Sequence, residues 1–294
     1  MGNLMQTRFG SREICNVTFK AKSEKKIGNK VFKKGEPIYV FDTLKASTLE
    51  SGSTSVYATG GRGNTRLVAW EGEKTVTFNM EDALISPMTF SILSGAGLEE
   101  YSDTETTKVH FSEVVQCGAA GTIDLSEALP TVTAGAKGGL VEPGDEGSVN
   151  YYEIFAYKID EYGNMGPATE GDMTLGAKEG SSDLVTISND NFEESEYYLI
   201  DCYIYAHATK LSVAGEDFAG SYYIEAETLF RRESDGVDMP ATFIIPHGKI
   251  QSNYTFNMVA AGDPSTFSFT VDALPDYVQF DRSRKVLFAI DILV

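Results

Sequence analysis

The feature that most constrains the fold is an alternation of apolar and small polar side chains near the C-terminus. It runs through YTFNM (254–258) and TFSFTV (266–271), with the turn-like AAGDPS (260–265) between them. Successive side chains of a strand point to opposite faces, so the pattern predicts a hairpin with one polar and one apolar face. Its polar face would carry Thr255, Asn257, Ser268 and Thr270. Its apolar face would carry Tyr254, Phe256, Met258, Phe267, Phe269 and Val271. Such alternation is typical of an antiparallel sheet with one solvated side.

The tetrapeptide TFNM occurs twice, at 77–80 and at 255–258, and each copy belongs to a segment that ends in DAL. We predict that the two copies occupy equivalent places in one antiparallel β-barrel. In the first copy, Thr77 and Asn79 would then lie on the wet face. The core would receive Val76, Phe78 and Met80.

Two local signals place a helix and a turn. In SPMTFSILSGAG (86–97), Ser86 precedes Pro87, which suits a first helical turn, and Gly95 and Gly97 end the segment. We expect one short helix near 87–94. Upstream, GGRGN (60–64) predicts a tight turn. The alternation on either side of 71–74 predicts a further turn there, and hence a hairpin within 66–84.

The net charge of −19 is unevenly distributed along the chain. Residues 1–50 contain more lysine and arginine than acid, whereas the remainder is strongly acidic. We expect a basic hairpin or loop at 20–34 to project from the body, either as a solvated loop or in contact with an acidic neighbouring copy. Its predicted contact residues are Lys20, Lys22, Lys25, Lys26, Lys30, Lys33 and Lys34. The acidic body does not favour binding of nucleic acid by phosphate neutralisation.

No catalytic, cofactor-binding or metal-binding pattern is recognised. Cys15, Cys117 and Cys202 are too scattered for a disulfide framework or a metal motif, and the three histidines are isolated from one another. No stretch approaches 18 apolar residues, so no membrane helix is predicted. The acidic residues at the strand exits, Glu81, Asp82 and Asp272, are interpreted as caps. A glycosidase pair at these positions is the weaker interpretation.

Three segments resemble structural proteins of large tailed bacteriophages, most closely the tail tube protein and with a contractile tail as the expectation. They are GGRGNTRLVAWEGEKTVTFNMEDALISPMTFSILSGAG, AGSYYIEAETLFRRESDGVDMPATFIIPHGKIQSNYTFNM and GDPSTFSFTVDALPDYVQFDRSRKVLFAI. The resemblance implies a barrel or sandwich of two packed sheets with one flanking helix. Residues 1–117 and 201–294 would form it. Residues 118–200 would be a β-rich insertion, with an immunoglobulin-like module as one interpretation.

The same resemblance implies a non-enzymatic virion protein, made in the bacterial cytoplasm and assembled into stacked hexameric rings. The rings would enclose a channel through which DNA passes without specific binding. The implied partners are further copies of the chain and the tail sheath, baseplate and terminator proteins, with no membrane contact. Two alternatives stay open: another tail component, such as a completion or baseplate hub protein, and a carbohydrate-binding or adhesive β-sandwich.

Overall fold

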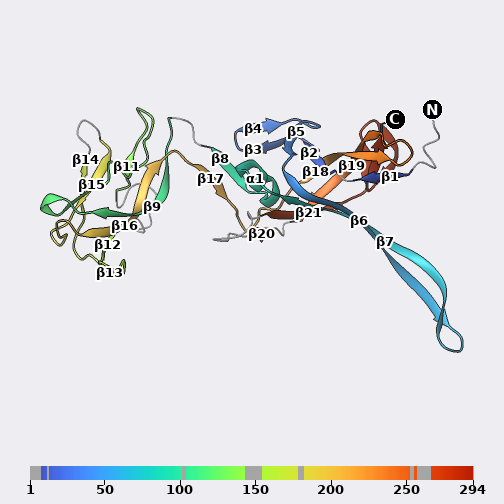
Figure 1. Cartoon of the computed structure of the whole chain (residues 1–294), viewed down its shortest axis with the longest axis horizontal. Coiled ribbons are helices and arrows are strands. Elements are labelled where there is room, and N and C mark those ends of the chain that lie inside the picture. Colours follow the sequence, from blue (N-terminus) through green and yellow to red (C-terminus); the bar gives the residue numbers. More distant parts are fainter. Residues whose placement is uncertain are drawn as a thin grey trace. The chain divides into compact units, whose positions relative to one another are not determined.

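The structure is a computed structural model that describes residues 8–11, 13–100, 104–142, 154–177, 182–251 and 266–293, and the backbone of 255–256. It is mainly β, with the single α-helix of the described residues near the middle of the first half of the chain (Figure 1). Two compact units are present. Unit 1 combines residues 1–99 with 211–294, and unit 2 contains residues 100–210. The segment expected as an insertion at 118–200 lies inside unit 2.

One antiparallel sheet of ten strands forms most of unit 1. Seven strands follow the order β5-β2-β18-β19-β21-β7-β6, while β1 pairs with β18, β20 with β21, and β24 with β19. The strands are β1 (Phe9–Ser11), β2 (Asn16–Ala21), β5 (Pro37–Phe41), β6 (Leu44–Gly60), β7 (Thr65–Asp82), β18 (Ser221–Arg232), β19 (Asp238–Ile250), β20 (Thr255–Phe256), β21 (Phe267–Ala273) and β24 (Ala289–Ile292). The predicted mainly β fold is confirmed, but this sheet does not close into a barrel within the described residues.

The core of unit 1 lies against one face of this sheet. Along β2 and β21 every second side chain is buried, as a strand with one solvated face requires. Phe41 lies between Phe19 and Phe269, with ring centroids 5.0 and 5.2 Å away. The remote ends of the chain therefore share one core.

The predicted helix is confirmed as α1 (Pro87–Ser94). The hydroxyl oxygen of Ser86 accepts a hydrogen bond from the backbone N–H of Thr89, which caps the first turn. Gly95 ends the helix in the left-handed conformation, φ 77°. The helix packs against the core of unit 1 through the buried side chains of Ile92 and Leu93.

The hairpin predicted around 71–74 is wrong. β7 passes through these residues without a turn and pairs with β6 from Leu44 to Gly60. The chain turns instead at the other predicted site, 60–64, where Gly61 and Gly63 adopt positive φ. A shift of register near Ser53 and Ser55, opposite 71–74, absorbs the irregularity. A long two-stranded ribbon results, and it extends beyond the sheet (Figure 1).

The basic segment does not project as expected. It folds into the short hairpin β3 (Lys25–Ile27) and β4 (Lys30–Phe32). Ile27 and Phe32 are buried in the core of unit 1 and so hold this hairpin against the body. A second short hairpin, β22 (Asp276–Val278) with β23 (Asp281–Val286), follows β21.

Unit 2 contains an eight-stranded sheet with its own core. Its strands are β9 (Thr107–Gln116), β10 (Thr122–Asp124), β11 (Gly139–Leu140), β12 (Phe155–Ile159), β13 (Met165–Ala168), β14 (Thr174–Ala177), β15 (Leu184–Ser188) and β16 (Tyr197–Ala206). β8 (Gly97–Glu100) pairs with β17 (Thr209–Ser212) where the chain enters and leaves this unit. A 3₁₀ turn lies at Ala119–Gly121.

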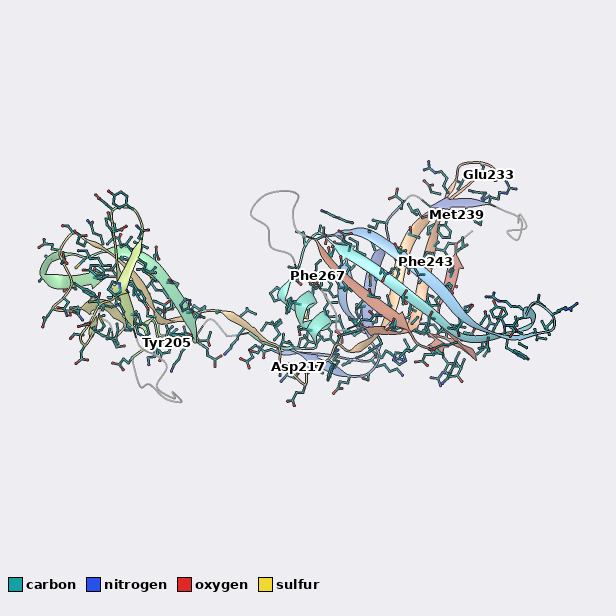
Figure 2. All side chains as sticks on the ribbon, turned by 90° about the horizontal axis from the view of Figure 1, so that it is seen from below. Tyr205, Asp217, Glu233, Met239, Phe243 and Phe267 are labelled. Atoms are coloured by element: carbon teal, nitrogen blue, oxygen red, sulfur yellow. The ribbon has the colours of Figure 1, made fainter. Side chains whose placement is uncertain are left out.

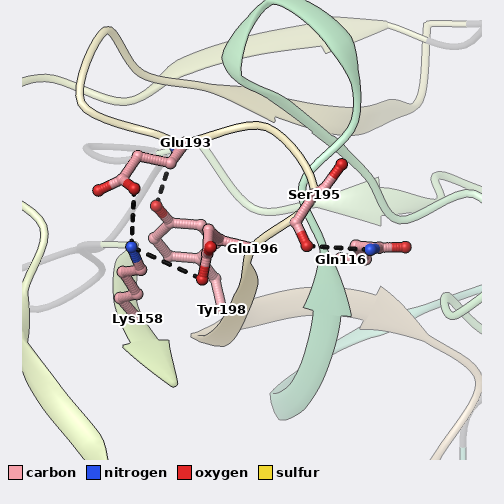
Figure 3. Close-up of polar contacts among 6 residues, drawn as sticks. All are labelled: Gln116, Lys158, Glu193, Ser195, Glu196 and Tyr198. Atoms are coloured by element: carbon pink, nitrogen blue, oxygen red, sulfur yellow. Dashed lines mark hydrogen bonds and ion pairs between the residues drawn. The ribbon is translucent and has the colours of Figure 1, made fainter. Parts of the chain in front are cut away.

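A polar latch holds the loop before β16 against β12 (Figure 3). The Lys158 ammonium lies 2.8 Å from a carboxylate oxygen of Glu193 and 3.6 Å from one of Glu196. The hydrogen bond to Glu193 is the main reason why the pKa of Lys158 is raised. The Tyr198 hydroxyl accepts a hydrogen bond from the backbone N–H of Glu193. These contacts give Lys158, Glu193, Glu196 and Tyr198 a structural role, because they hold the loop in place.

Candidate functional site

The predicted polar residues gather on one face of the β6–β7–β21 part of the sheet. The register places three cross-strand rows there, each with one residue from every strand. We call these nine residues the polar face: Ala46, Glu81 and Ser268; Thr48, Asn79 and Thr270; Glu50, Thr77 and Asp272. A shallow groove crosses the polar face, lined in part by Thr48, Asn79, Ser268 and Thr270.

The opposite face of the same strands is buried, as predicted. Every apolar side chain assigned to the core in β7 and β21 is at most 3 % exposed. These are Val76, Phe78, Met80, Phe267, Phe269 and Val271. Because a slip of one residue would exchange the two faces, this burial fixes the orientation of the polar face.

The polar face is acidic. It carries the carboxylates of Glu50, Glu81 and Asp272, and none of its nine residues is cationic. Asp272 accepts a hydrogen bond from the side-chain amide of Gln251. Lys249 lies opposite Asp272 on β19, but its ammonium donates to the carbonyl oxygen of Ala219. Such a surface repels a polyanion more than it binds one.

Four of the six predicted channel-facing residues lie together on the polar face: Thr77, Asn79, Ser268 and Thr270. Thr255 pairs with Ser268 through the backbone of β20, but its side chain lies outside the described residues, and so does Asn257. That this face lines a channel stays a prediction.

The two TFNM copies do not occupy equivalent places. β7, with the first copy, and β20, with the start of the second, flank β21 on opposite sides. Phe78 stands opposite Val271, whereas Phe256 stands opposite Phe267, so the copies are offset by four residues along β21. The TFNM repeat therefore reflects the same alternating strand pattern in two strands, which do not occupy symmetric positions in the sheet.

Four of the seven predicted contact lysines have partners inside the chain. The Lys30 ammonium lies 4.5 Å from the ring centroid of Phe32. The ammonium of Lys20 lies 2.6 Å from Glu225, and that of Lys22 lies 2.5 Å from Asp276. Lys25 is half-buried against Tyr222, to whose hydroxyl it donates a hydrogen bond. Lys26, Lys30, Lys33 and Lys34 are exposed.

The predicted acidic caps also differ from their expected roles. Asp82 is buried at the end of β7, where it accepts hydrogen bonds from the Thr43 hydroxyl at 2.5 Å and the Leu84 N–H at 3.2 Å. It therefore closes the strand, and Ser86 caps the helix instead. Glu81 and Asp272 lie on the polar face in adjacent strands.

The sequence reasoning missed the outer half of the β6–β7 ribbon. Residues 52–70 contain no buried side chain, although large apolar residues recur there. Continued alternation through 71–74, without a glycine–proline or asparagine–glycine turn, was the signal for a single long strand.

No group of metal-ligating side chains was found among the described residues. No described helix has the length and apolarity needed to cross a membrane.

Comparison with known families identifies a related family. The model of the YomU/Tube protein family matches residues 20–134 and 166–285, which together make up most of the chain. The two matched ranges include strands from both units and every strand that carries the polar face. The curated proteins include no match to the chain.

Proposed function

This chain belongs to the YomU/Tube protein family, and on that premise we propose that it is a structural subunit of a phage tail tube, stacked as hexameric rings around a channel for DNA. Family membership itself makes the chain a phage tube protein and a component of the virion. The number of subunits per ring, the channel and the passage of DNA belong to the proposal, as does the absence of catalysis.

The observation that supports a channel role most directly is the polar face. Eight of its nine adjacent residues present hydroxyl, amide or carboxylate groups, the ninth is an alanine, and none is a cation. Binding of DNA by a protein gains its affinity when lysine or arginine neutralises phosphates and releases counterions. A wall without such cations lets a duplex slide past it.

Contact between rings is assigned to the four exposed lysines of the basic segment, Lys26, Lys30, Lys33 and Lys34. Their charge is opposite to that of most of the chain. Exposed ion pairs are screened beyond a Debye length of about 8–10 Å near physiological salt, so assembly should weaken as salt rises. Sheath, baseplate and terminator proteins would complete the tail as further partners.

Negative-stain electron microscopy of the purified chain, with sedimentation at several salt concentrations, tests the proposal. We expect rings or tubes at low salt and fewer of them at high salt. The variant with Lys26, Lys33 and Lys34 changed to Glu should stay folded but assemble less. Chains that remain monomeric at every concentration and salt would contradict the tube function, whereas normal assembly of the lysine variant would contradict only the assigned contact.

A further inference from the structure

One face of the sheet in unit 2 is exposed along three neighbouring strands, β12, β16 and β9 (Figure 1). Every second residue of β16 from Tyr198 to Ile204 is buried in the core of unit 2, so the residues between them lie on the other side of the strand. Their cross-strand partners share that side, and none of these residues is buried. The face ends at Tyr205 (Figure 2), which is buried. We call the resulting eleven residues the aromatic face: His110 and Tyr203; Ser112, Asp201 and Phe155; Val114, Leu199 and Tyr157; Gln116, Tyr197 and Ile159.

Four aromatic rings and an imidazole gather on the aromatic face. Tyr197 is 50 % exposed and Phe155 is 38 % exposed. Phe155 stacks on Tyr157, with 6.4 Å between the ring centroids, and Tyr203 meets His110 edge to face at 5.8 Å. A contiguous patch of exposed apolar groups marks an interaction surface.

Hydrogen-bonding groups lie among these rings. Asp201 stands opposite Ser112, and one of its carboxylate oxygens lies 3.0 Å from a ring nitrogen of His110. The second carboxylate oxygen of Asp201 has no hydrogen bond to the described part of the chain. The side-chain amide of Gln116 donates to the carbonyl oxygen of Ser195 at 3.0 Å (Figure 3), which leaves its own carbonyl oxygen as an acceptor.

Charge excludes a polyanion as the ligand of the aromatic face. Unit 2 contains 21 aspartates and glutamates against five lysines and arginines, and no lysine or arginine belongs to the face. Such a surface repels nucleic acid and anionic lipid, because binding to them requires cations that neutralise phosphates.

The polar groups also disfavour a protein partner. The core of a protein–protein interface is depleted of charged residues. A protein lying on this face would bury the carboxylate of Asp201 and the imidazole of His110, which is costly unless each finds a matching partner. A saccharide meets both demands, since a sugar ring presents an apolar C–H face for stacking and hydroxyl groups around its edge.

We propose that the aromatic face of unit 2 binds a neutral polysaccharide. Sugar rings stack on Phe155, Tyr157 and Tyr197, and sugar hydroxyls bond to Asp201 and Gln116. From position 197 to position 203 the strand covers about 20 Å at its usual rise of about 3.4 Å per residue, which suits a chain of several sugars. This activity goes beyond the proposed tube function, because one copy of unit 2 suffices for it.

Binding of the purified full-length chain to particles of chitin, cellulose and an insoluble β-1,3-glucan tests the proposal. We expect wild type to bind at least one of the three. Phe155→Ala with Tyr197→Ala should raise the dissociation constant about tenfold or more, because two exposed stacking surfaces are lost. Asp201→Ala should weaken binding through the loss of a hydrogen-bond acceptor.

Tyr162→Ala is the matched control. Tyr162 is 81 % exposed but lies in the turn between β12 and β13, away from the aromatic face. This variant should bind as wild type does, and circular dichroism checks that every variant is folded.

The affinity for a neutral ligand should stay nearly constant as salt rises, because screening acts on charges. Binding of wild type to none of the three particles would overturn the proposal. So would equal binding by the Phe155 and Tyr197 double variant, or binding that disappears at high salt. Unassembled chains carry the same face, so the result does not depend on whether tubes form.

Discussion

The hydroxyl of Thr270 donates a hydrogen bond to the side-chain carbonyl oxygen of Asn79, with 2.8 Å between the two oxygens. The two residues are 191 positions apart in the chain and stand opposite each other in β21 and β7. This bond lies at the centre of the polar face. It uses the hydroxyl proton of Thr270 and the carbonyl oxygen of Asn79, and so it holds the two side chains together on the solvated side of the sheet.

Lysines on the polar face should convert it into a DNA-binding surface. We expect Ser268→Lys with Thr270→Lys to fold and assemble, because both positions lie on the solvated side of β21. Assembled particles should then retain duplex DNA at low salt and release it as salt rises, with a slope set by the number of phosphates contacted. Filter binding measures this. The matched control is Ser268→Gln with Thr270→Gln, which also removes the bond to Asn79. Equal retention by both variants would contradict a channel role for this face.

The two faces of β21 should differ sharply in their tolerance of truncation. Phe269 is buried, with ring contacts to Phe19, Phe41 and Phe267. Phe269→Ala should therefore lower the free energy of unfolding by about 3–5 kcal/mol. The neighbouring Ser268→Ala, on the exposed side, should change it by no more than about 0.5 kcal/mol. Urea unfolding followed by circular dichroism compares the two variants. Similar losses would mean that the orientation of β21 is wrong.

The glycine that ends α1 should not accept a side chain. Gly95 has φ +77°, and a Cβ there would lie 2.3 Å from the carbonyl oxygen of Phe218. Gly35 has φ +83° but open space around it. Gly35→Ala should lower the free energy of unfolding by only the penalty for a left-handed alanine, about 1–2 kcal/mol. Gly95→Ala should lower it clearly more, because the new Cβ also meets the backbone of Phe218. Thermal unfolding of both variants gives the comparison, and an equal cost would show that the contact with Phe218 yields without strain.

Lys25 should make stability rise with pH in an alkaline window. Burial, and then the charge of nearby Lys249, lower the pKa of Lys25 from 10.5 to about 8. Between about 8 and 10.5 the folded protein has released this proton and the unfolded chain still holds it, so the unfolded state binds more protons and the free energy of unfolding increases with pH. At pH 7 the buried charge is therefore unfavourable.

Comparison with Lys25→Met isolates this effect. Burial raises the pKa of Cys202 and of Tyr222, which pulls stability in the opposite direction at alkaline pH, but both groups are present in both proteins. The free energy of unfolding of wild type minus that of the variant should increase from pH 8 to pH 10. A difference that stays constant or falls over this range would contradict the lowered pKa.

Local patterns in the sequence were sufficient for the parts of the fold that depend on neighbouring residues. Alternation of period two assigned Phe78, Phe269 and Val271 to the core, because a strand turns successive side chains to opposite faces whatever lies beyond it. Ser86 and Gly95 placed the helix for the same kind of reason, since capping satisfies backbone groups within one turn. The polar face follows as the other side of the same strands.

Only the tertiary structure decided where these parts lie. The alternation of β7 is compatible with a turn at 71–74 or with an uninterrupted strand, and its pairing with β6 selects the strand. The basic segment contains two apolar residues, Ile27 and Phe32, and burial in a core built by remote strands holds it to the body. For β7 and β21 the sequence by itself thus determined which side chains face the core and which face solvent, because that depends on the period of the backbone. Strand register, the length of the β6–β7 ribbon and the offset of the TFNM copies required the structure, because they depend on pairing between segments far apart in the chain.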